Sequence, residues 1–438
     1  MSFKYFPHTS QDIDDMLARV GVSSLDALYA DVPDEIRFKG DYNLPEAKSE
    51  VEVRRFFDNL CREDRQLVCF AGDGVYDHYT PAIIPYIVQR SEFLTSYTPY
   101  QAEISQGTLS YIFEYQSMMA RLTGMDISNA SMYDGTTATA EAVMMAAAVA
   151  KKMNTVLVSE TVSPKIVDVV KTYAHFHGIG IEIIPQDAGA TDIAAVKSRL
   201  DGGDVAGVVV QQPNRYGVIE DFTGLADACH DRKALLIMNS VAADLALLKP
   251  PCEWGADIAV GDGQSLGIPM SFGGPSVGYM CCTEKLMRKM PGRIVGETRD
   301  SRGNRAFVLT LQAREQHIRR QKATSNICSN ESLMALFVTI YMATMGKQGI
   351  KEAASLSYAG AHYLFDGLAK TDRFKPVYDR EFFNEFCVRY DGDVDELRGK
   401  LADNGILGGV KLADDIIMFA VTEKRSKEEI DNLVALCK

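Results

Sequence analysis

Between residues 154 and 240 the chain alternates short runs that are apolar throughout with longer runs of helical periodicity. A strand with one face in water alternates apolar and polar residues, whereas a strand of a parallel sheet is covered on both faces and is apolar throughout. Strand, helix and strand in succession imply right-handed crossovers and a doubly wound α/β domain, whose ligands bind at the carboxyl ends of the strands. The apolar runs are NTVLVSE (154–160), GIEIIPQ (180–186), VAGVVVQQP (205–213) and ALLIMNS (234–240).

The chain has 438 residues, more than one hydrophobic core organises, so we expect several compact parts. Residues 1–70 are polar and helical in pattern, which predicts an arm that lies over another surface. Residues 71–325 carry the alternating strands and helices of a large α/β domain. From 326 to 438 two long helical stretches lead into strands and shorter helices, which predicts a small C-terminal α+β domain.

The charge and cysteine content exclude several classes of function. A net charge of −13 argues against a nucleic-acid partner, which needs a basic face. Nine cysteines are scattered without a CxxC pair, so we expect free thiols and no metal site. The N-terminus lacks the apolar core of an export signal, and no apolar run suggests a membrane span. We therefore expect a cytoplasmic protein that binds small molecules or other proteins.

The segment YDGTTATAEAVMMAAAVAKK (133–152) predicts a strong Ala-rich helix that begins near Gly135, Thr136 and Thr137. Free N–H groups and the positive end of the helix dipole make such a start suitable for a phosphate. The alternative is plain N-capping by Thr136 or Asp134, and residue type alone favours it.

A match to G-x-S-x-G occurs at GQSLG (263–267), with Ser265 in the nucleophile position. That motif requires a helix to begin at the serine. The continuation IPMSFGGPS contains Pro269, Gly273, Gly274 and Pro275, which prevent a helix. We therefore interpret the match as accidental.

Three other segments hold polar candidates. Asn214 and Tyr216 follow an apolar strand and either face a ligand or shape a turn. The Arg-rich run 293–322 would suit an acidic partner, although a solvated or subunit-facing helix is the simpler interpretation. His175 and His177 end a predicted helix and are expected to cap or pack there.

The segment SYTPYQAEISQG (96–107) crowds aromatic and polar side chains beside a proline, just before a predicted helix. These groups would either line a pocket for a small zwitterion or pack a surface loop. The candidates for binding are Tyr97, Thr98, Tyr100 and Gln106.

The segment IAVGDGQSLGIPMSFGGPSVGY (258–279) predicts a strand, a Gly-rich loop with Gln264 at its tip, and a second strand. With the Gly-Thr-Thr turn and the small domain, this loop resembles the pyridoxal-phosphate enzymes of the aspartate aminotransferase fold, fold type I. More narrowly, the chain is similar over nearly its whole length to the family of glycine dehydrogenase (decarboxylating) subunit 1, the α subunit of the two-subunit P-protein of the glycine cleavage system. The motifs that carry this resemblance, in order, are TSYTPYQAEISQG, NASMYDGTTATAEA, QQPNRYGVIED, GDGQSLGIPMSFGGP and REQHIRRQKATSNICSN.

The resemblance implies that the chain keeps the frame of a cofactor pocket without its chemistry. Pyridoxal phosphate needs a lysine amine for its covalent bond, an acid beside its ring nitrogen and commonly a ring stacked on its face. By comparison with the β subunit, Gln264 stands at the lysine position, Ser240 at that of the acid and Glu160 at that of the stacking histidine. A shifted alignment would restore an acid through Asp244. Residues 135–137 then form a vestigial phosphate site.

The resemblance also implies a partner. In the family, α and β form an α2β2 assembly; β holds pyridoxal phosphate, and glycine loses CO2 while its aminomethyl group passes to the lipoyl arm of H-protein. Tyr97, Thr98, Tyr100 and Gln106 would reach toward glycine or the lipoyl entrance. Two alternatives remain: a self-sufficient pyridoxal-phosphate enzyme that uses another lysine, such as Lys285, and a non-enzymatic scaffold.

Overall fold

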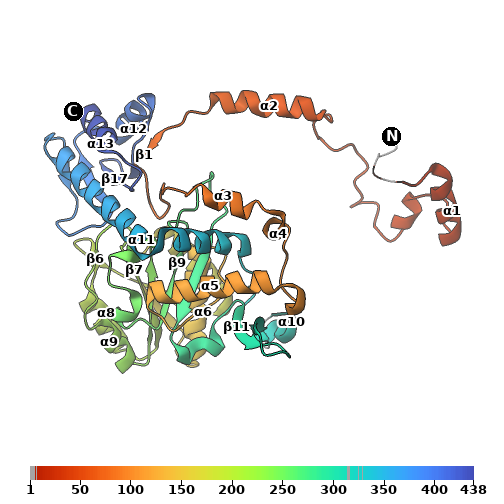
Figure 1. Cartoon of the computed structure of the whole chain (residues 1–438), viewed down its shortest axis with the longest axis horizontal. Helices are drawn as coiled ribbons and strands as arrows, with labels where there is room; N and C mark the ends of the chain where they lie inside the picture. The colour runs from red at the N-terminus through yellow and green to blue at the C-terminus, as the bar shows by residue number, and fades with distance from the viewer. Residues whose placement is uncertain (1–4, 6, 313–315, 324, 328) are drawn as a thin grey trace. The chain divides into compact units, whose positions relative to one another are not determined.

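A computed structural model describes residue 5 and residues 7–312, 316–323, 325–327 and 329–438 (Figure 1). Contacts divide the chain into two compact units, Met1–Arg65 and Gln66–Lys438. The first unit ends at Arg65 rather than at residue 70, because β1 (Val68–Cys69) pairs in parallel with β15 (Ile406–Leu407) of the second unit.

The first unit is helical, as expected of an arm. It contains α1 (Ser10–Val20), a 3-10 turn, η1 (Asp26–Tyr29), and α2 (Glu50–Glu63). Both α-helices begin with a capping box, in which a hydroxyl side chain and an acidic side chain exchange hydrogen bonds with the first turn. No residue of these helices is buried, and α2 presents an apolar stripe at helical spacing that consists of Val53, Phe56, Phe57 and Leu60.

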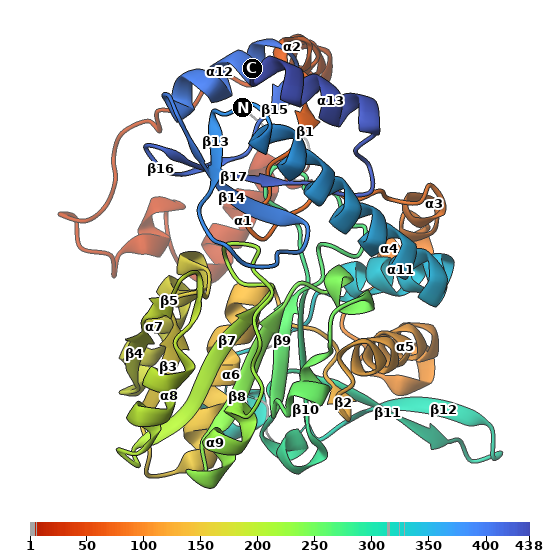
Figure 2. The same cartoon turned by 90° about the vertical axis from the view of Figure 1, so that its left-hand side faces the viewer.

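A seven-stranded sheet forms the centre of the second unit (Figure 2). Neighbouring strands from β9 to β4 are parallel, while β10 runs antiparallel to both of its neighbours. The expected mixed, mostly parallel sheet of fold type I is therefore confirmed. In sheet order the strands are β2 (Ile127–Ser128), β10 (Gly278–Cys282), β9 (Ile258–Asp262), β8 (Leu235–Ser240), β7 (Val205–Gln212), β3 (Thr155–Ser159) and β4 (Gly180–Ile184).

Helices cover both faces of this sheet, which explains why its strands lack polar alternate positions. On β7, Val209 packs with residues of α6 and α7, whereas Val208 and Val210 pack with residues of α8 and α9. Successive residues of one strand thus enter opposite cores. The helices are α6 (Gly135–Ala150), α7 (Pro164–His177), α8 (Ile193–Leu200) and α9 (Leu225–Asp231).

A long helix, α11 (Ser332–Ala369), joins the large sheet to the smaller C-terminal part. Its first half packs with α3 (Ile83–Val88), α5 (Gln106–Thr123) and β10, and its second half packs on the small sheet. Backbone angles of φ 59° and ψ −179° at Gly346 divide the two halves. The large and small parts therefore meet within one kinked helix rather than at residue 326.

By length and apolar composition, α11 is the one helix of the described residues that could cross a bilayer. This helix is interrupted by charged residues, beginning with Lys347, so the expectation that the chain has no long uncharged apolar run is not contradicted. Its side chains belong to two protein cores, with Val338 and Tyr341 buried in one and Ala361 and Leu364 in the other.

The small part is a four-stranded antiparallel sheet covered by helices, as the α+β pattern predicts. A separate antiparallel hairpin, β11 (Ile294–Arg299) with β12 (Arg305–Thr310), extends from the large part. The elements of the small part are β13 (Phe374–Pro376), β14 (Glu385–Tyr390), α12 (Val394–Asp403), β16 (Val410–Ala413), β17 (Ile416–Ala420) and α13 (Lys427–Leu436).

Candidate functional site

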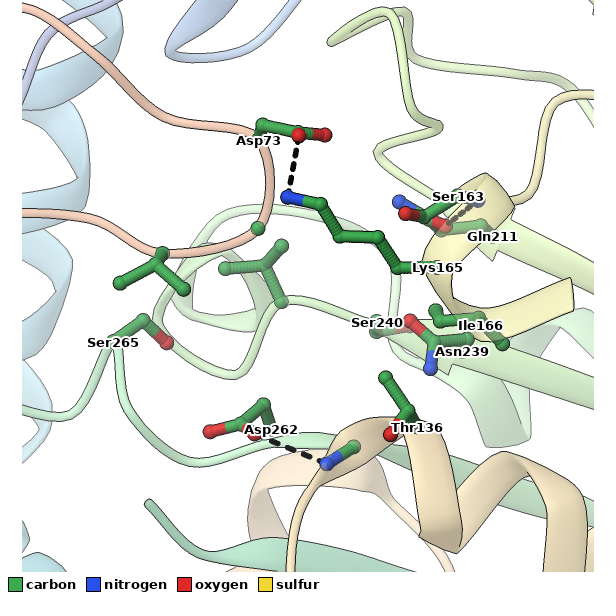
Figure 3. A pocket seen from close by; sticks show the side chains of 14 residues that line it. Asp73, Thr136, Ser163, Lys165, Ile166, Gln211, Asn239, Ser240, Asp262 and Ser265 are labelled. Carbon is green, nitrogen blue, oxygen red and sulfur yellow. Dashed lines mark hydrogen bonds and ion pairs between the residues drawn. The ribbon is translucent and has the colours of Figure 1, made fainter. Parts of the chain in front are cut away.

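A pocket lies at the carboxyl edge of the large sheet, where β7, β8 and β9 end and where α6 and α7 begin (Figure 3). Open α/β sheets bind their ligands at this edge. The empty space measures about 720 Å³ with its open mouth included. Among the residues that line it, those with polar side chains are Asp73, Thr136, Ser163, Lys165, Gln211, Asn239, Ser240, Asp262 and Ser265.

Two carboxyl groups occupy the N-terminus of α6, where a phosphate was expected as one alternative. Asp134 caps the helix: its Oδ1 accepts hydrogen bonds from Thr137 N at 2.8 Å and from Thr136 Oγ1 at 2.6 Å. Asp262 Oδ2 accepts a hydrogen bond from Gly135 N at 3.0 Å. The structure therefore shows the capping alternative, with a carboxylate of β9 where an external anion would bind.

Asp262 is held by three donors. Besides Gly135 N, its carboxyl accepts hydrogen bonds from Gln264 N at 2.8 Å and from Ser276 Oγ. Burial raises the pKa of Asp262, and these hydrogen bonds oppose the rise. The β9 strand end thus carries a hydrogen-bonded carboxyl group that the sequence analysis did not single out.

Gln264 does not lie at an exposed tip but is 4% exposed. Its Oε1 accepts a hydrogen bond from Tyr76 N at 2.9 Å, and its Nε2 donates to Tyr76 O at 2.8 Å and to Ile268 O at 2.7 Å. Both polar atoms of the carboxamide are therefore used to hold the Gly-rich loop against the Tyr76 segment. Gln264 supports the pocket from behind, whereas the next residue, Ser265, lines it.

Ser265 is not a nucleophile elbow. Its Oγ accepts a hydrogen bond from Ala243 N at 3.1 Å, and the chain continues from it as turns rather than as a helix. The structure agrees with the interpretation of GQSLG as accidental.

The positions of Ser240, Asp244 and Glu160 differ. Ser240 lines the pocket, and its buried hydroxyl has no hydrogen-bond partner among the described residues. Asp244 is buried away from the pocket lining; burial, and then the nearby carboxyl of Glu385, raise its pKa well above the ordinary value. Glu160 also lies outside the described pocket lining, and its carboxylate accepts a hydrogen bond from Gln186 N at 3.0 Å.

Glu385 links the small sheet to the segment beside the pocket. Its carboxyl accepts hydrogen bonds from Asp73 N at 2.5 Å and from Tyr76 OH at 3.0 Å. Burial raises the pKa of Glu385 to about 7, although both hydrogen bonds oppose the rise. A protonatable group therefore joins the two parts of this unit next to the pocket.

Sequence reasoning missed the charged pair at the pocket mouth. Lys165 Nζ lies 2.6 Å from Asp73 Oδ2, and this lysine, not Lys285, lines the pocket. Lys285 is exposed on η5 (Glu284–Lys289), a 3-10 turn. Lys165 begins the helix that follows the first central strand, and this position at the carboxyl edge was the signal available in the sequence.

The 96–107 loop lies apart from this pocket, since none of its residues is among the described lining. Tyr97 is 84% exposed and Tyr100 is 62% exposed. The carboxamide of Gln106 is not free: Nε2 donates to Phe307 O at 2.8 Å and to Ala102 O at 2.7 Å, and Oε1 accepts from Phe307 N at 2.9 Å. Gln106 thus attaches β12 to the start of α5.

Beneath the same loop lies Arg293, which is 4% exposed. Its Nη1 lies 3.5 Å from Thr98 Oγ1 and 3.2 Å from Ser329 Oγ, and its guanidinium carbon is 5.6 Å from the centre of the Tyr100 ring. Nε has no partner, and no carboxylate pairs with this guanidinium among the described residues. A buried cation with only neutral partners is unusual, because removing charge from water is costly.

The remaining candidates have structural roles. Asn214 shapes its turn, with Oδ1 accepting from Tyr216 N at 2.9 Å and Nδ2 donating to Gly189 O at 2.7 Å. His177 Nδ1 contacts Tyr173 O at 2.9 Å near the end of α7. In the Arg-rich run 293–322, residues 313–315 lie outside the described residues.

Pyridoxal phosphate does not fit the pocket residues of this chain. The residue expected at the lysine position is a carboxamide whose polar atoms are all hydrogen-bonded. The start of α6, which would hold the phosphate, already carries the carboxyls of Asp134 and Asp262. A phosphate there would face two carboxyl groups at close range, which is unfavourable.

Comparison with known proteins shows the family to which this fold belongs. The family model described as "Glycine cleavage system P-protein" matches residues 3–437. A protein of Geobacillus thermodenitrificans named "Probable glycine dehydrogenase (decarboxylating) subunit 1" is 47% identical, and the alignment covers 99% of this chain and 98% of that protein. A protein of Listeria innocua with the same name is 48% identical over the same shares.

Solved structures show the same relation. A crystal structure of glycine decarboxylase (P-protein) of the glycine cleavage system in inhibitor-bound form superposes with a TM-score of 0.90 at 41% identity, covering 99% of each chain. A glutamate decarboxylase of Lactobacillus brevis superposes with a TM-score of 0.68 at 13% identity over 92% of this chain and 95% of the other, which shows a shared fold alone. The chain belongs to the glycine cleavage system P-protein family.

Proposed function

We propose that this chain is the cofactor-free subunit of a glycine decarboxylase, active only with a second subunit that carries pyridoxal phosphate. The observation that carries the proposal is the buried carboxamide of Gln264, whose polar atoms are all hydrogen-bonded. By the family resemblance, Gln264 would stand at the lysine position. The name "subunit 1" of the bacterial relatives supports a two-subunit enzyme. We infer an α2β2 assembly located in the cytoplasm.

In the proposed reaction glycine loses CO2, and its aminomethyl group passes to the oxidised lipoyl arm of H-protein. Bound to the partner, pyridoxal phosphate would supply the electron sink for decarboxylation. This chain would bind and orient substrates and keep water away from the reacting carbon.

The face of this chain that we assign to that role is the exposed loop with Tyr97, Thr98 and Tyr100. Its basis is Arg293, a buried cation without a carboxylate partner among the described residues. A carboxylate that approaches the loop would complete the hydrogen bonding of the guanidinium, which is a strong, charge-assisted interaction. Glycine bound on the partner is a ligand of this chemistry.

Reconstitution tests the proposal. The purified chain, a candidate second subunit and lipoylated H-protein are mixed, and glycine-dependent exchange of labelled CO2 is measured. We expect exchange only when both subunits are present. Exchange by this chain alone, or failure of the two chains to form a complex, would refute it.

Arg293→Met tests the assigned face in the active complex. We expect KM for glycine to rise at least about tenfold, the cost of one charge-assisted hydrogen bond. Arg299→Met is the matched control, because Arg299 is exposed on β11 and donates only to Gly303 O in the same hairpin. Equal KM values in the two variants would remove Arg293 from the substrate face.

One observation favours a second function, a self-sufficient pyridoxal-phosphate enzyme. Lys165 lines the pocket and carries an amino group, and its Nζ lies 2.6 Å from Asp73 Oδ2. Borohydride treatment of the chain with pyridoxal phosphate discriminates the two: stable labelling of Lys165 or Lys285 together with activity favours this function.

A further inference from the structure

The pocket is lined by polar groups of opposite hydrogen-bonding character (Figure 3). Lys165 and Gln211 carry donors and lie in the upper half of the view. Asn239 and Asp262 carry acceptors; Asn239 lies below Gln211, and Asp262 lies apart at the lower left. The proposed two-subunit decarboxylase uses none of these four side chains.

The free atoms of the two amides are determined by their neighbours. Thr139 Oγ1 donates its one proton to Gly135 O at 2.8 Å, so the Thr139 hydroxyl must be the acceptor in its 2.9 Å contact with Asn239. The atom of Asn239 in that contact is therefore the donor Nδ2, and Oδ1 is left toward the pocket. Similarly, Ser163 N donates to Gln211 Oε1 at 2.9 Å, which leaves Nε2 as the outward atom. The orientation of both amides is therefore settled by donors and acceptors that cannot be exchanged.

Both outward atoms lack hydrogen-bond partners. Asn239 is 7% exposed and Gln211 is 8% exposed, and neither Asn239 Oδ1 nor Gln211 Nε2 bonds to any described residue. Both atoms open into the pocket, where a ligand of complementary chemistry would replace the solvent that they meet. One atom requires a donor and the other requires an acceptor.

The charges of the pocket select the same kind of ligand. Lys165 and Asp73 neutralise each other at the mouth, and the carboxyl of Asp262 lies deeper. A phosphate would be repelled at the start of α6, whereas an ammonium group would be attracted there. A lysine side chain carries three donors when charged, so Lys165 can bond a ligand carboxylate while it keeps its ion pair with Asp73.

We propose that this pocket binds a short α-amino acid as its zwitterion. The ammonium group donates to Asn239 Oδ1 and to Asp262, and the carboxylate accepts from Gln211 Nε2 and from Lys165. All residues of the described lining belong to this chain, and none of them lies in the 96–107 loop. It makes the chain an amino-acid-binding subunit whether or not the proposed decarboxylase activity is found.

The test measures binding to the purified full-length chain without any partner, by calorimetry and saturation-transfer NMR. The probes are glycine, L-alanine and L-serine as zwitterions, acetate and methylamine as the two halves, and inorganic phosphate as the competing anion. We expect at least one amino acid to bind ten or more times more tightly than either half, with no competition from phosphate.

Lys165→Met and Asn239→Leu should each weaken that binding at least tenfold. The matched control is Lys171→Met, because Lys171 is exposed on the same helix and is not part of the pocket lining. Arg293→Met should leave binding unchanged, which separates this site from the proposed catalytic face. Lys165 has a side chain that is 65% exposed, so its variant keeps the test valid if Asn239→Leu does not fold.

Three results would overturn the proposal: saturable binding of none of the amino acids, displacement of the amino acid by phosphate, or unchanged affinity in Lys165→Met. Because no partner and no turnover are involved, these results say nothing about reconstituted decarboxylation. Conversely, amino-acid binding to this pocket can still be measured on a chain that fails to reconstitute decarboxylation.

Discussion

The carboxamide of Gln264 and the backbone of Tyr76 form a reciprocal pair of hydrogen bonds, at 2.9 Å and 2.8 Å, across 188 positions of the chain. The third bond of the side chain closes the loop onto Ile268 O at 2.7 Å. An amide is suited to this role because it carries a donor and an acceptor, whereas a lysine ammonium carries donors only. The carboxamide at position 264 thus builds a structural contact between the Gly-rich loop and the Tyr76 segment.

Replacing Gln264 should therefore destabilise the fold. Gln264→Ala leaves the backbone groups Tyr76 N and Ile268 O unpaired, while Tyr76 O keeps its hydrogen bond from His78 N. We expect a loss of about 2–4 kcal/mol in the free energy of unfolding, measured with urea. Gln264→Lys should also be destabilising and should not yield a borohydride-stable cofactor adduct at position 264. Gln89→Ala, at an exposed position, is the control and should change stability by less than about 0.5 kcal/mol.

Glu385 should make the stability of the protein depend on pH. Its pKa is about 7 in the folded state against an ordinary 4.5, so the folded state binds the proton more tightly than the unfolded state. The stabilisation of the folded state by this tighter proton binding is fully present below pH 4.5 and is lost as pH rises through about 7. From the two pKa values the loss is roughly 3 kcal/mol by pH 8.

Glu385→Gln removes that titration. We expect the free energy of unfolding of the variant to change less than that of the parent chain between pH 5 and pH 8, with the difference largest above pH 7. The facing groups Asp244, Tyr76, Asp73 and Lys165 are the same in both proteins. Parallel pH profiles of the two proteins would contradict the prediction.

Gln106 is expected to stabilise the β11–β12 hairpin rather than to bind substrate. Gln106→Ala removes its exchange of hydrogen bonds with Phe307, so we expect a loss of about 1–3 kcal/mol in unfolding free energy. In the reconstituted complex KM for glycine should stay within twofold of the parent value. Gln101→Ala, at an exposed position in the same loop, should change neither quantity, and a large KM change in Gln106→Ala with unchanged stability would show the opposite role.

A side chain at position 346 should destabilise the fold, although no atom lies within 4 Å of a Cβ added to Gly346. Its angles, φ 59° and ψ −179°, belong to a region that residues other than glycine rarely adopt. Gly346→Ala should therefore cost about 1–3 kcal/mol, as measured by thermal and urea unfolding. Gly399→Ala is the matched control, for which we expect the opposite effect on stability. Gly399 lies inside α12 with open space around it, so an alanine there should stabilise the fold by up to about 1 kcal/mol.

Local patterns were sufficient for the main features of the fold. The apolar runs that predict β3, β4, β7 and β8 form parallel strands, because a run covered on both faces needs no polar alternate positions. Family membership also followed from the sequence, since the motifs that carry it are contiguous. The capping of α6 by Asp134 was among the sequence alternatives because an N-cap is a local interaction.

The side-chain roles at the pocket depended on contacts that no local pattern contains. Gln264 meets Tyr76, Asp262 meets Gly135 and Glu385 meets Asp73 across 188, 127 and 312 positions, so each role is decided by where the chain folds back. Lys165 became a candidate only when α7 placed it beside Asp73. The sequence by itself determined the family and the sheet, because these rest on residue identity and short-range periodicity. Tertiary structure alone decided which polar atoms are already hydrogen-bonded and which remain open to a ligand, because that depends on neighbours distant in the chain.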